Sequence, residues 1–167
     1  MLALKIIDIK EFMNKLLIRE TFDHLEVIES TITTFNTFSI NGRYQKDFFD
    51  NDVQNSLEES HQNYVTWKEI RSYCLSIIRG KRTPLYFKLI FQLPYTDVCT
   101  LLQKSNSTIN PEIIGGLFLN IQFKNKELYC TTGTSFQTFV PDTSLKQIWD
   151  SYVVDFFRHN QIPFEEL

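Results

Sequence analysis

The chain has 167 residues, and its content of 43% hydrophobic and 14% aromatic residues excludes an intrinsically disordered protein. Its formal net charge of −3 excludes a polycation that binds nucleic acid by bulk charge alone. The length suffices for one domain with a hydrophobic core, and we predict a single domain over residues 1–167.

The amino-terminal segment predicts a strand over residues 2–7, followed by a helix. Asp8 and Glu11 have the spacing of a capping box, in which the aspartate covers the first free N–H groups of a helix. Apolar residues then recur at helical spacing up to about residue 20. Internal charges and the lack of a small-residue cleavage site distinguish this segment from a secretory signal peptide, and no apolar run reaches the length of a membrane span.

Residues 23–63 predict antiparallel strands and a long loop. The strands are expected at 23–29, 31–40 and 43–49, with Asn41-Gly42 as a type I′ turn between the last two, because both central positions of that turn need positive φ. The polar, acidic segment 50–63 predicts an exposed loop.

The rest of the chain alternates between helical and strand patterns. A capping box at Thr66 and Glu69 begins a helix that Gly80 ends. Further elements are a strand at 85–93, a helix from about residue 96, a loop at 105–112 and a helix from Ser144. Between the loop and this last helix, residues 116–124 and 127–140 predict two strands, or three if the second folds back near Gln137.

Two halves, 1–80 and 84–160, share the order strand, helix, antiparallel strands, helix. "ITTFNTF" in the first half corresponds to "CTTGTSF" in the second, and similarity on this scale suggests a duplicated unit. Shared amphipathic patterns are the alternative explanation. The predicted fold class is therefore α+β, with a pseudo-duplicated sheet, helices on one side and the acidic loop at 50–63 as the main insertion.

Four stretches together resemble a family of short bacterial proteins known only as a domain of unknown function. They are "MLALKIIDIKEFMNKLL", "ITTFNTFSINGR", "RGKRTPLYFKLIFQL" and "GLFLNIQFKNKELYCTTGTSFQTF". The resemblance covers nearly the whole chain, and it implies no activity and no catalytic residue.

The run "LPYTDVCTLLQKSN…GGLFLNIQFKNKELYCTTGTSFQTF" is similar to one domain of a DNA sliding clamp, in which a short helix precedes a strand pair. The similarity implies a continuous sheet with grouped helices. The chain departs from the pattern because it ends on a long helix and supplies only about one of the two or three domains of a clamp subunit. Ring closure around DNA therefore does not follow from the resemblance.

The densest group of cations is the candidate contact surface for a partner. Lys68, Arg71, Arg79, Lys81 and Arg82 lie on or beside the polar side of the second helix, where they could contact phosphates or an acidic partner. The alternative is an ordinary helix C-terminus, whose dipole favours cations. Both interpretations stay open, and the second is the more common one.

No other residue pattern predicts chemistry. Thr131-Thr132-Gly133-Thr134 lacks the spacing, lysine and following helix of a phosphate-binding loop, and Glu58-Glu59 and Glu165-Glu166 are expected as solvated surface charges. His24, His61 and His159 are too scattered for a predicted metal site. Cys74, Cys99 and Cys130 are expected as structural thiols of a cytoplasmic protein. We expect no cofactor and no metal.

Three functional hypotheses stay open. The first, which we favour, is a non-enzymatic binding module with a clamp-like fold that binds protein or nucleic acid. The second is a small-ligand-binding protein or enzyme whose site assembles from scattered residues such as Thr34, Asn36, Thr132 and Thr134. The third is a dimer joined by exposed strand edges. We expect a protein partner or self-association in preference to a small molecule, nucleic acid as a less supported partner, and no membrane. The carboxyl-terminal "IPFEEL" is expected to be a frayed end.

Overall fold

A computed structural model describes residues 1–141 and 143–167. The strands are β1 (Ala3–Ile6), β2 (Glu26–Thr33), β3 (Thr37–Asn41), β4 (Tyr86–Gln92), β5 (Ile114–Lys124), β6 (Glu127–Phe136) and β7 (Phe164–Glu166). The helices are α1 (Ile9–Leu17), α2 (Asn51–Glu59), α3 (Trp67–Ile78), α4 (Tyr95–Lys104) and α5 (Ser144–His159), and short 3₁₀ turns occupy Lys46–Phe48 and Pro111–Ile113.

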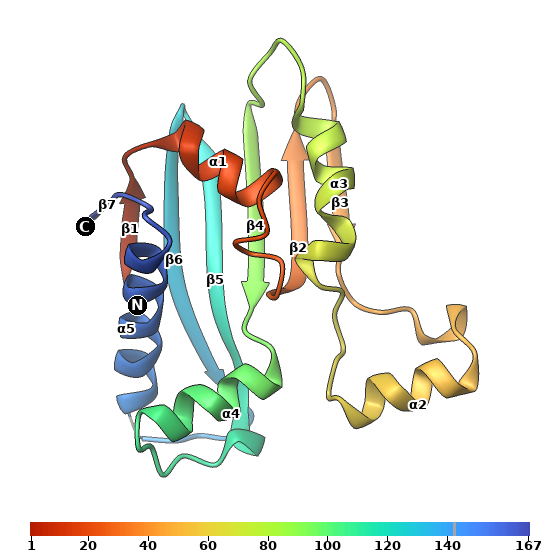
Figure 1. The fold of residues 1–167 in the computed structure, drawn as a ribbon, viewed down its shortest axis with the longest axis vertical. Coiled ribbons are helices and arrows are strands. Elements are labelled where there is room, and N and C mark those ends of the chain that lie inside the picture. Colours follow the sequence, from red (N-terminus) through yellow and green to blue (C-terminus); the bar gives the residue numbers. More distant parts are fainter. Residues whose placement is uncertain (142) are drawn as a thin grey trace.

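The strands form one antiparallel sheet in the order β3-β2-β4-β5-β6-β1-β7. Helices α1, α3 and α5 lie over one face of this sheet, α4 crosses its lower end, and α2 extends away to the side (Figure 1). The fold is α+β, as predicted. No helix in the described ranges is long and apolar enough to cross a membrane.

The core lies between the helices and one face of the sheet. In β4, Phe87, Leu89 and Phe91 are buried while the residues between them are only half-buried, because side chains alternate between the faces of a strand. Helices α1, α3 and α5 cover this apolar face with large rings, among them Phe12, Trp67 and Trp149, and each buried indole has its N–H satisfied. Trp67 donates to the Leu16 carbonyl at 2.6 Å and Trp149 to the Phe118 carbonyl at 2.8 Å.

The first threonine-rich phrase is a hairpin, and the predicted single strand over 31–40 is wrong. Strand β2 continues to Thr33, and the Thr34 N–H donates to the Asn36 carbonyl at 2.9 Å within the turn. The hydroxyls of Thr33 and Thr37 face each other at 2.9 Å. The second phrase lies in the single strand β6, so the two phrases occupy different structures despite their similar letters.

Gly42 does not form the predicted hairpin turn, and residues 43–49 do not form a strand of the sheet. Instead, the segment that precedes α3 lies between β2 and the end of β3. The Val27 N–H donates to the Val65 carbonyl, and the Val65 N–H donates to the Gly42 carbonyl, both at 2.8 Å. A Cβ at position 42 would lie 1.6 Å from the Val27 carbonyl oxygen. Glycine is therefore required for a close backbone approach, and the two-residue hairpin with positive φ is instead at Asn125 and Lys126.

Residues 51–59 form helix α2 where an acidic loop over 50–63 was predicted. The Asp50 carboxylate accepts from the Val53 N–H at 3.1 Å and caps the helix. The segment is exposed as expected, and it buries no residue. Val53 and Leu57 are the only apolar residues of this helix, so its apolar pattern is weak, which explains the wrong prediction.

The carboxyl-terminal tail is a strand, not a frayed end. Strand β7 pairs with β1, and the Leu167 N–H donates to the Ala3 carbonyl at 3.0 Å. Ile162 is buried and the Phe164 ring contacts Phe157 of α5. These apolar contacts hold the last residues against the edge of the sheet.

The element order of the two halves repeats, but their strand pairing differs. Strand β4 pairs with β5 of its own half, whereas β1 pairs with β6 and β7. The pairing thus gives no symmetry between the halves, and duplication stays a prediction from the sequence.

Candidate functional site

The structure separates the five predicted contact residues into three groups. Arg71 is structural, because its guanidinium makes two contacts to the Asp23 carboxylate at 2.9 and 3.0 Å and donates to the Ile18 carbonyl at 2.8 Å. These bonds tie α3 to the segment that follows α1. Lys68 is exposed in the first turn of α3, eleven residues before Arg79, which corresponds to about 16 Å of helix.

Arg79, Lys81 and Arg82 remain together, in the loop that joins α3 to β4. The loop is adjacent to two others, since the Leu85 N–H donates to the Thr33 carbonyl at 2.9 Å and Tyr86 is paired with Lys124. Residues 34–36, 79–85 and 124–126 therefore meet at the upper end of the sheet in Figure 1.

We call this region the basic end, defined by Arg79, Lys81, Arg82, Lys124 and Lys126. All five side chains are exposed, and none forms an ion pair with a described residue. The three segments contain no aspartate or glutamate. The adjacent Glu127, which lies opposite Lys124 in the sheet, is ion-paired with Lys5 of β1. Two exposed apolar residues accompany it, Phe35 and Leu85.

A cavity of about 260 Å³ opens beneath the cationic loop. The stacked rings of Phe87 and Phe123, 5.3 Å apart, line it together with apolar side chains of α1 and the end of α3. Arg79, Lys81 and Arg82 form part of its wall. The basic end thus combines an apolar recess with cations at its opening.

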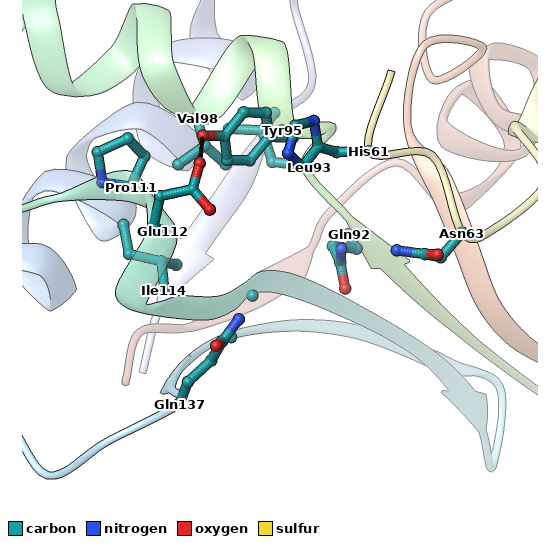
Figure 2. A pocket seen from close by; sticks show the side chains of 12 residues that line it. His61, Asn63, Gln92, Leu93, Tyr95, Val98, Pro111, Glu112, Ile114 and Gln137 are labelled. Atoms are coloured by element: carbon teal, nitrogen blue, oxygen red, sulfur yellow. Dashed lines mark hydrogen bonds between the residues drawn. The ribbon is translucent and has the colours of Figure 1, made fainter. Parts of the chain in front are cut away.

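The opposite end of the sheet carries a second cavity, of about 160 Å³, which we call the polar pocket. It lies at the end of β4 that is remote from the basic end, and it is drawn in Figure 2. Leu93, Val98 and Ile114 supply its apolar wall. The polar residues that line it come from four separate segments: His61, Asn63, Gln92, Tyr95, Glu112 and Gln137.

A stacked ring pair borders the polar pocket. The rings of His61 and Tyr95 lie nearly parallel, 4.4 Å apart between centroids, and His61 has a left-handed backbone with φ of 57°. The Tyr95 hydroxyl donates to a carboxylate oxygen of Glu112, as the dashed line in Figure 2 shows. This hydrogen bond raises the pKa of Tyr95 to about 12, so the phenol keeps its proton at neutral pH.

A buried carboxyl group contacts one residue of the polar pocket. Glu26 is 4% exposed, and the Gln92 amide donates to it at 3.4 Å. Burial, with the neighbouring charge of Asp97, raises the pKa of Glu26 to about 7. This hydrogen bond orients the Gln92 carboxamide.

Other residues considered in the sequence do not assemble into a site. Thr34 and Asn36 lie in the β2–β3 turn, whereas Thr132 is buried on β6, where its hydroxyl accepts from the Leu2 N–H at 2.8 Å and contacts Asp150. Burial raises the pKa of the thiols of Cys74 and Cys130, which makes them poor nucleophiles. Within residues 1–141 and 143–167, no group of three His, Cys, Asp or Glu side chains is placed to hold a metal ion.

Comparison with known proteins gives one match. The model of a family described as "Family of unknown function (DUF5721)" matches residues 15–165, which confirms the predicted resemblance to a family of that kind. No curated protein and no solved structure matches the chain, so the similarity to a sliding-clamp domain stays a prediction.

Proposed function

The chain belongs to this family of unknown function, and we propose that it is a non-enzymatic binding module whose basic end holds an acidic segment of a partner protein. One observation carries the proposal: three exposed cations without ion-pair partners among the described residues, Arg79, Lys81 and Arg82, line an apolar cavity of about 260 Å³. A protein partner can use both features at once.

The two features act at different stages of binding. Uncompensated positive charge at one end attracts an acidic partner during diffusional encounter and sets its orientation. Affinity in protein interfaces concentrates in a few apolar or aromatic side chains that fill pockets. The recess lined by Phe87 and Phe123 supplies such a pocket next to Arg79, Lys81 and Arg82.

A protein partner fits the basic end better than a nucleic acid. A polynucleotide would contact the cations through phosphates, but it would leave the apolar recess unused. Binding of single strands also relies on several stacking rings, whereas Phe35 is the exposed ring among residues 34–36, 79–85 and 124–126.

Selection from a random peptide library displayed on phage tests the proposal without a known partner. We expect the selected peptides to combine aspartate or glutamate with one bulky apolar residue. The triple variant R79E/K81E/R82E should lose them, because it reverses the charge at the cavity opening. The matched control K68E/K104E/K146E reverses three exposed cations elsewhere and should keep them.

Fluorescence anisotropy with single- and double-stranded oligonucleotides tests whether the basic end binds nucleic acid instead of a protein. Oligonucleotides that bind at low micromolar protein with a steep salt dependence, and that displace the selected peptides, would make nucleic acid the partner and overturn the proposal. Peptides that are retained by the triple variant would also overturn it, because their site would then lie elsewhere.

A further inference from the structure

We propose that the polar pocket is a binding site for a nucleobase with an exocyclic amino group, as the free base or a nucleoside. The inference is independent of the partner at the basic end. It rests on the stacked pair His61 and Tyr95, on three carboxamides that line the same cavity, and on the charge of its surroundings.

The ring pair provides a stacking platform. His61 and Tyr95 are already parallel within 18°, and a flat heterocycle can extend such a stack because every base has a π-face. Tyr95 begins α4, and its hydroxyl is fixed by Glu112. The platform is therefore formed before any ligand arrives.

The carboxamides provide paired hydrogen-bond groups. Asn63, Gln92 and Gln137 lie around the space next to the ring pair in Figure 2. An amide side chain presents a donor beside an acceptor, the arrangement that matches the edge of a base. The Asn63 and Gln137 side chains make no hydrogen bond to any described residue, whereas Gln92 is oriented by Glu26.

The charge around the pocket selects the chemical class of the base. No lysine or arginine lines the cavity, and Glu112 does. Asp97 and Glu26 lie close enough to interact electrostatically with each other. A carboxylate oxygen accepts a hydrogen bond from an exocyclic amine, as in recognition of cytosine N4, and it repels a phosphate. The site therefore favours adenine or cytosine over uracil, and an uncharged nucleoside over its monophosphate.

The volume sets an upper limit on the ligand. A cavity of about 160 Å³ is smaller than the roughly 300–1,000 Å³ of pockets that enclose drug-sized molecules. One base fills such a space, and a ribose would lie at the open side. Leu93, Val98 and Ile114 would contact the remaining ring surface.

Saturation-transfer NMR and calorimetry with adenosine, cytidine, uridine and adenosine monophosphate test the inference on the full chain. We expect adenosine and cytidine to bind at about 1 mM or below, with weaker binding of uridine and of the monophosphate. His61→Ala should weaken adenosine binding about tenfold, because it removes one ring of the stack. Asn63→Leu and Gln137→Leu should weaken adenosine binding, whereas Glu112→Gln should reduce the preference for adenosine over uridine. Tyr73→Ala removes an exposed ring elsewhere on α3 and should have no effect.

Three results would overturn the inference. The first is the absence of a transfer signal from every nucleoside at about 1 mM. The second is adenosine binding that is unchanged in both His61→Ala and Asn63→Leu. The third is binding of the monophosphate that inorganic phosphate displaces. Circular dichroism shows whether each variant is folded, and the exposed positions of His61 and Asn63 make unfolding an unexpected outcome. R79E/K81E/R82E should bind adenosine normally, so failure of one proposal leaves the other intact.

Discussion

The two ends of the sheet differ in how their charge is arranged. At the basic end, Arg79, Lys81 and Arg82 are exposed and make no ion pair with the described residues. At the polar end, Glu26 is buried with a raised pKa, and Glu112 accepts from a tyrosine hydroxyl. The net charge of −3 gives no indication of this difference between the two ends. Under the two proposals, the loops at the two ends of one strand, β4, would bind two unrelated ligands.

Among the substitutions considered, Gly42→Ala should lower the free energy of unfolding most, and its effect should begin at the polar end. Gly42→Ala would place a methyl group 1.6 Å from the Val27 carbonyl oxygen, so the segment that carries Asn63 must move. We expect a loss of at least about 4 kcal/mol in the free energy of unfolding, measured by urea denaturation. Hydrogen exchange at Val65 should accelerate before exchange in β5 does.

Gly133→Ala is the matched control for this change. Its nearest contact would be an ordinary 3.8 Å to Phe118, and the free energy of unfolding should change by less than about 1 kcal/mol. Equal effects of the two variants would show that the close approach at Gly42 does not fix the polar end.

Substitutions of Arg71 and Arg79 test which of these two cations belongs to the basic end. Arg71→Ala leaves the Asp23 carboxylate, whose side chain is only 10% exposed, without its cation. The free energy of unfolding should fall by about 3 kcal/mol. Arg79→Ala should change it by less than about 0.5 kcal/mol, because Arg79 is exposed. If Arg71→Ala instead weakened peptide binding without loss of stability, Arg71 would belong to the contact surface.

The polar end should make stability depend on pH through Glu26. Its pKa rises from 4.5 to about 7 on folding, so between these values the native state keeps a proton that the unfolded state has lost. Stability therefore decreases as the pH rises through this window, by about 3 kcal/mol in total. Glu26→Gln keeps a neutral group against Gln92 and should remove the decrease.

Urea denaturation of wild type and Glu26→Gln at several pH values checks the sign. The variant should match the wild type near pH 4.5 and exceed its stability at about pH 8. A wild-type stability that increases across this range, with no difference from the variant, would show that Glu26 ionises normally.

The sequence predicts the parts of the fold that have an apolar period. The helices α1, α3 and α5 and the strands β4 and β5 follow such patterns, and their positions agree with the prediction to within a few residues. Helix α2 has no buried residue, and β7 depends on pairing with β1 across the whole chain. Local patterns contain neither kind of information.

The candidate sites could likewise be predicted only where their residues are close together in the sequence. Arg79, Lys81 and Arg82 are adjacent in sequence, and they remain adjacent in the structure. Lys124 and Lys126 join them only because Tyr86 pairs with Lys124. The polar pocket takes residues from His61 to Gln137, and its stacked pair forms only after α2 and α4 are placed. No spacing rule could have identified it.

The smallest expected effect distinguishes the ring of Tyr95 from its hydroxyl. Tyr95→Phe removes the hydrogen bond to Glu112 but keeps the ring beside His61. Because stacking depends on the π-face, adenosine affinity should change by less than about twofold, whereas Tyr95→Ala should weaken it about tenfold. In a tyrosine absorbance titration, Tyr95→Phe should lack the group that titrates near pH 12. Equal losses in the two variants would instead mean that the hydroxyl bond to Glu112, and not the stack, forms the platform.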